Sequence, residues 1–296
     1  MSQRLAAAIG MFDGVHRGHR HLLSTVSEAA RSRGLHPAAV TFRAHPSLVL
    51  TPENAVKQLT TAEERKRLLL DAGMEEVIVL DFDSYLRNMT SAEFIRMLHE
   101  RYNIDCLIVG FNNRFGCDRE HNLEDYVRFG RAEGVEVIGA TETPDVKVSS
   151  SIVRRLLEKG EVENAAEALG RCYRLEGKVV GGKRLGRQIG FPTANIEPES
   201  GLSLIPASGV YAAFVTDSAN PAVRHKAMLN IGRRPTVNTG HDITVEAHLL
   251  DFKGDLYGHT LSVEFAARLR DERRYPSLES LAAVLATDAA VTRRII

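Results

Sequence analysis

The sequence predicts an α/β protein with two domains: an N-terminal doubly wound parallel sheet and a C-terminal antiparallel β-barrel with a C-terminal helix. Three observations support this fold class. The 296 residues exceed the usual size of one domain. Apolar runs alternate with amphipathic segments as far as Gly170, and beyond it strand patterns follow one another directly. We therefore expect domains at residues 1–170 and 171–296.

In the first domain, short apolar runs predict buried strands, and the segments between them predict helices. Thr61 and Thr90, each followed three residues later by a glutamate, predict a capping box at two helix starts. Strands that alternate with helices in this way form a parallel sheet covered on both faces. The predicted strands are 5–9, 37–42, 77–82, 104–110 and 135–140.

In the second domain, predicted strands are joined by short connections that contain glycine or proline, and no helix is expected between them. Several of these strands alternate polar and apolar residues, which is typical of half-buried antiparallel strands. A final helix is expected from Ser277 to about Arg294. Such a pattern indicates a barrel with one docked helix. The predicted strands are 173–180, 209–216, 225–231, 243–251 and 260–266.

The composition limits the classes of function. Lys plus Arg and Asp plus Glu both number 38, so a net charge of zero argues against nucleic acid as a partner. The three widely spaced cysteines predict neither a disulfide framework nor a metal knuckle. Neither a signal-peptide core nor a run of ~20 apolar residues is present. We expect a soluble cytoplasmic protein, a monomer or weak oligomer that does not bind membranes.

Segment 12–19, FDGVHRGH, lies between an apolar run and an amphipathic run. This strand–turn–helix context places free N–H groups and the positive end of a helix dipole at the turn, and both attract phosphate. His16 and His19 can donate further hydrogen bonds to the same anion, and Gly18 lets a ligand approach the backbone. With His21 nearby, a metal site or a solvated loop is an alternative, although no Cys, Asp or Glu follows at ligand spacing on that helix. The segment predicts a nucleotide-phosphate site.

Two more segments of the first domain carry candidate ligand groups. Ser150 and Ser151 open a predicted helix, where their hydroxyls either bind phosphate or cap the backbone. Arg154 lies one turn further, and its planar fork can clamp phosphate oxygens. Asn112 follows an apolar strand and either binds a ligand or forms a turn.

In the second domain, the candidates are neutral oxygens and one carboxylate. Thr193 and Asn195 lie two residues apart on an extended chain, so their side chains share a face. Their oxygens can complete the shell of a phosphate-bound Mg²⁺, or they can belong to a polar turn after Pro192. Glu246 alternates with apolar neighbours on a predicted strand. It could act as a general base or simply face solvent.

Together these segments resemble the motifs of bacterial bifunctional riboflavin kinase/FMN adenylyltransferases, also called FAD synthetases, in the same order. In the first domain these are FDGVHRGH, TFRAHP (41–46), VGFNNRFG (109–116) and SSSIVR (149–154). In the second they are GFPTAN (190–195), PASGVYA (206–212), NIGRRPT (230–236), VEAH (245–248) and LRDE (269–272). Ala44 and Asn113 depart from the usual pattern, and we expect them to tune packing or flavin contacts. The resemblance covers nearly the whole chain.

The resemblance implies a riboflavin kinase in the barrel, which makes FMN and ADP, and a nucleotidyltransferase in the Rossmann-like domain, which makes FAD and pyrophosphate. Both use ATP with Mg²⁺, and the flavins are substrates and products. It implies catalytic roles for His16, His19, Arg154 and Glu246, and Mg²⁺ ligation by Thr193 and Asn195. Asp13 is a possible metal ligand or a residue that shapes the turn. The binding residues that it implies are Gly10, Phe12, Asp13, Gly18, Asn112, Ser150, Ser151, Gly182, Lys183, Arg187, Gly190, Pro192 and Arg270.

Two other functions stay open. One domain could be retained only as a flavin- or nucleotide-binding module without turnover. A different nucleotidyltransferase with the same histidine turn fits the first half of the chain, but it does not explain the motifs of the second half.

Overall fold

The computed structural model describes residues 3–110, 113–118, 121–140, 148–182, 185–236 and 240–296. The chain divides into two compact units, Met1–Ser150 and Ser151–Ile296, and each is described by itself. Helices α7 (Ser150–Glu158) and α8 (Val162–Leu169) thus group almost entirely with the second unit. This structural division falls earlier in the chain than the boundary expected near Gly170.

The described part of the first unit contains a five-stranded parallel sheet in the order β3-β2-β1-β4-β5. The chain runs outward from the central strand β1 to β3 and then returns to the other side of β1. The order reverses between β1 and β4, which is where open parallel sheets bind ligands. Each predicted strand is confirmed within two residues at either end. The strands are β1 (Leu5–Ile9), β2 (His36–Phe42), β3 (Glu76–Leu80), β4 (Ile104–Val109) and β5 (Glu136–Gly139).

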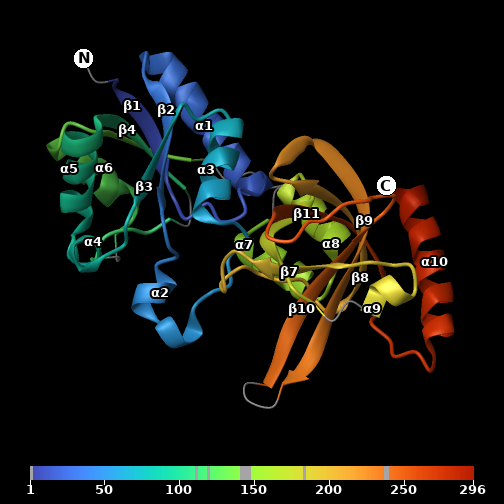
Figure 1. The fold of residues 1–296 in the computed structure, drawn as a ribbon. Helices are drawn as coiled ribbons and strands as arrows, with labels where there is room; N and C mark the ends of the chain where they lie inside the picture. The colour runs from blue at the N-terminus through green and yellow to red at the C-terminus, as the bar shows by residue number, and fades with distance from the viewer. Residues whose placement is uncertain (1–2, 111–112, 119–120, 141–147, 183–184, 237–239) are drawn as a thin grey trace. The chain divides into compact units, whose positions relative to one another are not determined.

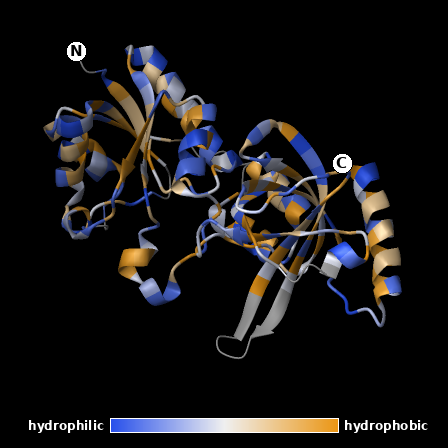
Figure 2. Ribbon diagram, viewed as in Figure 1, coloured by the Kyte–Doolittle hydropathy of each residue, from blue (hydrophilic) through white to orange (hydrophobic). Residues whose placement is uncertain are grey.

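Helices cover both faces of this sheet (Figure 1). Alternate residues of β1 enter two separate cores. One core is shared with α1 (Arg17–Arg33) and α3 (Ala62–Asp71), and the other with α5 (Ser91–Tyr102) and α6 (Leu123–Ala132). Figure 2 shows the hydrophobic residues gathered on the strands and polar residues on the outer sides of these helices. The shorter elements are α2 (Ser47–Leu50), η1 (Pro52–Asn54) and α4 (Ser84–Asn88).

Both predicted helix starts are confirmed. The Thr61 hydroxyl accepts a hydrogen bond from the Glu64 backbone N–H at 3.1 Å and caps α3. Thr90 and Glu93 form a reciprocal capping box at the start of α5. Each cap satisfies N–H groups that the first helical turn leaves without partners.

The second unit forms a closed antiparallel barrel, whose described residues give the strand order β10-β7-β6-β11-β8-β9. The sequence did not predict β7, which carries few large apolar residues and forms because it pairs with both β6 and β10. The expectation of no helix between strands is wrong at one place, because the single-turn helix α9 (Leu185–Gln188) lies between β6 and β7. The strands are β6 (Tyr173–Val180), β7 (Ala194–Pro198), β8 (Gly209–Asp217), β9 (Asn220–Thr236), β10 (Gly240–Leu249) and β11 (Thr260–Arg270).

The C-terminal helix α10 (Leu278–Ile295) begins at Ser277, as predicted, and packs against β9. Its buried residues include Ala289, which shares a small core with Met228 and Leu250. Within the described residues, no helix combines the length and the apolar character that a membrane crossing requires.

Candidate active sites

The turn after β1 has an unusual backbone. Phe12 and Val15 have φ angles of 49° and 40°, and Gly14 between them has 83°. A positive φ is uncommon outside glycine and is a clear outlier for a β-branched residue such as valine. Such a conformation persists only where neighbouring groups hold it, and these sites concentrate at functional positions.

The carboxylate of Asp13 holds this turn. Asp13 is 1% exposed and accepts hydrogen bonds at 3.0 Å from the backbone N–H groups of Leu59 and Thr60 and from the Thr60 hydroxyl. The Thr60 hydroxyl oxygen in turn accepts a bond from the Gly14 N–H at 3.2 Å. These bonds support the turn-shaping role of Asp13, one of the two roles that the sequence left open. Neither Leu59 nor Thr60 was singled out in the sequence, because the contact joins segments far apart in the chain.

The two histidines face the same way, as their spacing predicted. His16 caps α1 by accepting a hydrogen bond from the His19 N–H at 3.3 Å, and the two rings stack with centroids 3.7 Å apart. Burial and the positive charges of His16 and Arg65 hold the pKa of His19 well below its usual value. A Cβ atom at Gly18 would lie 3.2 Å from the His16 ring, so glycine leaves this stack undisturbed. An imidazole pair at a helix N-terminus can donate hydrogen bonds to phosphate.

The serine segment joins the same turn. The Ser150 hydroxyl donates a hydrogen bond to the backbone carbonyl of Asp13 at 2.8 Å. Ser151 is exposed and Arg154 is half-buried on α7, and both belong to the second unit. The structure thus brings Ser150 to the histidine turn, while Arg154 stays a sequence-based assignment. Phe12 is buried and contacts His19 edge-on, with ring centroids 5.2 Å apart, so its ring helps to hold the His19 imidazole in place.

A cavity of about 220 Å³ lies at the carboxyl ends of the strands of the first unit. Gly10 lines it, and a Cβ atom there would lie 3.3 Å from the Phe12 ring. Asn113 lines it too and donates a hydrogen bond from Nδ2 to the Ile9 carbonyl. Asn112 lies outside the described residues. Part of its wall is aromatic and suits a flat ring system; this part consists of His45 and four phenylalanines, Phe42, Phe82, Phe94 and Phe115.

On the barrel, Glu246 lies in a row of polar side chains. In the sheet register it is directly opposite Asn195 of β7 and Asn230 of β9, so the three side chains share a face. The Thr193 hydroxyl donates a long hydrogen bond of 3.5 Å to the Glu246 carboxylate. A side chain at Gly182 would overlap the amide of Asn195, which explains why glycine is suited to that position. The sequence predicted Thr193, Asn195 and Glu246 separately, and the barrel brings them together.

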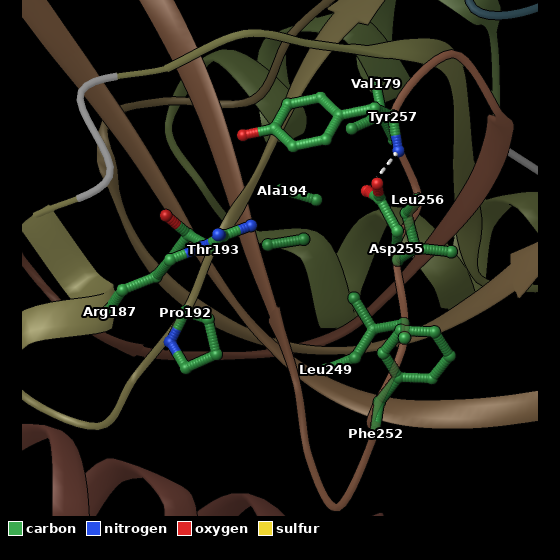
Figure 3. A pocket seen from close by; sticks show the side chains of 12 residues that line it. Val179, Arg187, Pro192, Thr193, Ala194, Leu249, Phe252, Asp255, Leu256 and Tyr257 are labelled. Atoms are coloured by element: carbon green, nitrogen blue, oxygen red, sulfur yellow. Dashed lines mark hydrogen bonds between the residues drawn. The ribbon is translucent and has the colours of Figure 1, made fainter.

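Two cavities flank this row, and Thr193 lines both. The larger, about 280 Å³, is lined by Glu246, Asn230 and Arg270 together with an apolar wall from α10. The smaller, about 80 Å³, has Arg187, Pro192 and Thr193 on one side and Asp255 and Tyr257 on the other (Figure 3). Lys183, expected at this site, lies outside the described residues. Gly190 has a φ of 78°, which lets the chain turn a few residues before β7.

Arg270 is fixed by a residue that the sequence analysis missed. Its guanidinium donates from Nε and Nη2 to the carboxylate of Asp288 at 2.7–3.2 Å and lies 5.7 Å from the Tyr275 ring centroid. Asp288 lies on the buried side of α10 and is only 6% exposed. An acidic residue on the apolar face of an amphipathic helix is the only sequence signal that could have found it.

Donor chemistry limits the metal that these sites could hold. Among the residues that the structure describes, no group of three or more His, Cys, Asp or Glu side chains is arranged to bind a metal ion. The Thr193 hydroxyl and Asn195 amide, with the Glu246 carboxylate beside them, form an all-oxygen set. Such a set fits Mg²⁺ bound mainly through substrate phosphates.

Comparisons with known proteins agree with this division into two sites. The FAD synthetase family model matches residues 1–152, and the riboflavin kinase family model matches residues 169–296. The bifunctional riboflavin kinase/FMN adenylyltransferase of Pseudomonas fluorescens is 36% identical over 292 residues, which cover 98% of this chain and 92% of that protein.

The protein of the same name from Escherichia coli strain K12 is 36% identical over 289 residues, 96% of this chain and 90% of that protein. A solved structure, titled as a macrolide-efflux protein from Streptococcus pneumoniae, superposes with a TM-score of 0.87 at 30% identity. That match covers 99% of this chain and 95% of the solved one. The whole two-domain chain, rather than one half of it, is therefore shared with these proteins.

Proposed function

Since this chain belongs to the bifunctional riboflavin kinase/FMN adenylyltransferase family, we propose how its residues carry out the two reactions. The barrel converts riboflavin and ATP into FMN and ADP, and the N-terminal domain converts FMN and ATP into FAD and pyrophosphate. We assign residues 1–170 to the second reaction and 171–296 to the first, a division supported by the riboflavin kinase match that begins at residue 169.

In the kinase site, the larger cavity takes the flavin ring and the smaller one takes part of ATP. Thr193 lines both cavities, so the ribityl hydroxyl and the γ-phosphate meet beside Glu246. Glu246 accepts the proton of that hydroxyl as it attacks phosphorus. Arg187 and Lys183 contact ATP, while Gly182 and Gly190 allow their segment to fold over it.

Mg²⁺ fits the kinase donor set, with Thr193 and Asn195 as its protein ligands. It supplies positive charge to the phosphate oxygens when bound. The packing of Asn195 against Gly182 and the hydrogen bond of Thr193 to Glu246 orient these two oxygens before ATP arrives. Positioning of this kind accounts for much of phosphoryl-transfer catalysis.

In the adenylyltransferase site, the cavity with the aromatic wall takes the isoalloxazine ring of FMN. The FMN phosphate attacks the α-phosphorus of ATP, and pyrophosphate leaves. His16 and His19 hold the phosphates where charge develops, and Ser150, Ser151 and Arg154 hold the leaving group. Asn112 orients the substrates. The buried bonds of Asp13 support a role in keeping the turn in shape.

The proposed partners are ATP, riboflavin and FMN. We also propose a cytoplasmic enzyme, which is consistent with free cysteines at Cys106, Cys117 and Cys172. For its oligomeric state we propose a monomer or weak oligomer, and sedimentation velocity measures it.

The grouping of Thr193 and Asn195 with Glu246 carries the proposal, because it gives the barrel a general base and a phosphate–metal site together. Purified protein supplied with riboflavin, ATP and Mg²⁺ should form FMN and then FAD. His19→Ala should stop at FMN, and Glu246→Gln should make FAD only from supplied FMN.

Glu197→Gln, which changes an exposed glutamate on the same strand as Asn195, is the matched control and should keep both activities. Normal FAD formation by His19→Ala would contradict the site assignment. Calorimetric binding of FMN without release of pyrophosphate would instead support a binding module.

A further inference from the structure

Arg65 on α3 is fully buried, with 0% of its surface exposed. Its Nη2 donates hydrogen bonds to the carbonyls of Phe42 and Arg43, at the end of β2. Its Nε and Nη1 atoms are buried and have no hydrogen-bond partner among the described residues. A buried cation with unsatisfied N–H groups is costly, so its presence requires an explanation.

Arg65 lies close to the histidine turn. Its positive charge lowers the pKa of His19, and the negative carboxylate of Asp13 stabilises the charged form of Arg65. The strand end that it holds includes Phe42, which lines the cavity proposed for the flavin ring. Arg65 thus contacts a strand end that lines the flavin cavity, and its charge also acts on the histidine turn proposed to bind phosphate.

We propose that Arg65 is a positioning residue for adenylyl transfer: it supplies a fixed positive charge near His19 and holds the end of β2 beside the flavin cavity. This inference rests on the proposed function of the N-terminal domain. Because its free N–H groups are buried, Arg65 acts through His19 and the field at the turn, not through contact with the substrate. A charge held in place in a site without water stabilises the charge that develops on the phosphates, because no protein group has to move during the reaction.

A purely structural role for Arg65 predicts a different response to mutation. Removing one partner of a buried charged contact usually destabilises a protein, so Arg65→Met should lower the melting temperature in either case. The two roles differ well below that temperature, where the variant is folded. There a structural role predicts wild-type adenylyl transfer, and a positioning role predicts a loss.

The test compares Arg65→Met and Arg65→Lys with Arg67→Met, an exposed arginine on the same helix. The substrates are FMN and ATP with Mg²⁺, and riboflavin kinase activity of the same samples is the internal control. We expect kcat/KM for FAD formation to fall at least about tenfold in Arg65→Met. Arg65→Lys should recover most of the rate, and Arg67→Met should match the wild type.

A second measurement needs no substrate. Burial lowers the pKa of His19 most, and the charged groups that lower it further are His16 on the same turn and Arg65 from α3, with Asp13 opposite Arg65. Since a nearby positive charge lowers a histidine pKa, Arg65→Met should raise the pKa of His19, followed by NMR titration of its imidazole. The acid limb of the pH–rate profile should move to higher pH by the same shift.

The outcomes separate the two proposals. An Arg65→Met protein with wild-type FAD formation, or with an unshifted His19 pKa, would overturn the role of Arg65. A loss of FAD formation no larger than the unfolded fraction of Arg65→Met at the assay temperature would also overturn it. If the wild type itself formed no FAD from FMN, the proposed function would fail, while the titration would still test Arg65.

Discussion

Asp13→Asn should destabilise the N-terminal domain although it preserves the shape of a buried side chain. Three donors, from Leu59 and Thr60, bind the Asp13 carboxylate at 3.0 Å. Hydrogen bonds to a charged acceptor contribute about 1.5–3 kcal/mol and those to a neutral one about 0.5–1.5 kcal/mol. Each bond therefore loses roughly 1 kcal/mol, and the three together about 3 kcal/mol. That is a large part of the ~5–15 kcal/mol that stabilises a typical domain.

Urea unfolding of the full chain, followed by circular dichroism, measures this loss. With a slope of about 2 kcal/mol per M urea, the transition of the N-terminal domain should move down by roughly 1.5 M. The barrel transition should not move. Asp81→Asn is the control, since the Asp81 side chain forms an exposed ion pair with Arg43, worth about 0–1 kcal/mol. An unchanged midpoint for Asp13→Asn, with an altered Mg²⁺ requirement for FAD synthesis, would refute the anchoring role and favour metal ligation.

Three further predictions concern the two sites. Glu246→Gln should slow FMN formation about 10²- to 10⁴-fold, the usual contribution of a general base, as measured by chromatography of the flavins; a smaller loss contradicts that role. Asp288→Asn should raise the KM for riboflavin roughly tenfold because Arg270 loses a charged, bidentate partner; an unchanged KM argues against it. Because the pKa of His19 is lowered by folding, the unfolded chain binds more protons below pH ~6.5, so stability should fall as the pH drops below that value. Urea midpoints at several pH values measure this slope, which should be smaller in His19→Gln.

The sequence alone predicted most of the architecture. Apolar runs and glycine-bearing connections located the strands of the first sheet within two residues and most of the barrel strands. The exception was β7, whose residues carry little apolar signal and whose pairing with β6 and β10 is entirely non-local. Asn195 lies in β7 and Thr193 directly before it, and the barrel places both beside Glu246, while their role as metal ligands stays a prediction.

By itself the sequence determined the fold class, the two motif sets and the spacing of His16 and His19, since each depends on local periodicity. Tertiary structure decided that the Asp13 carboxylate binds the segment at Thr60 and that Glu246 lies opposite Asn195. It also decided that Asp288 binds Arg270 and that the charge of Arg65 acts on His19. These relations join residues that lie at least 18 positions apart in the chain. Burial and charge at such contacts depend on how the elements pack, and no local pattern of residues encodes that packing.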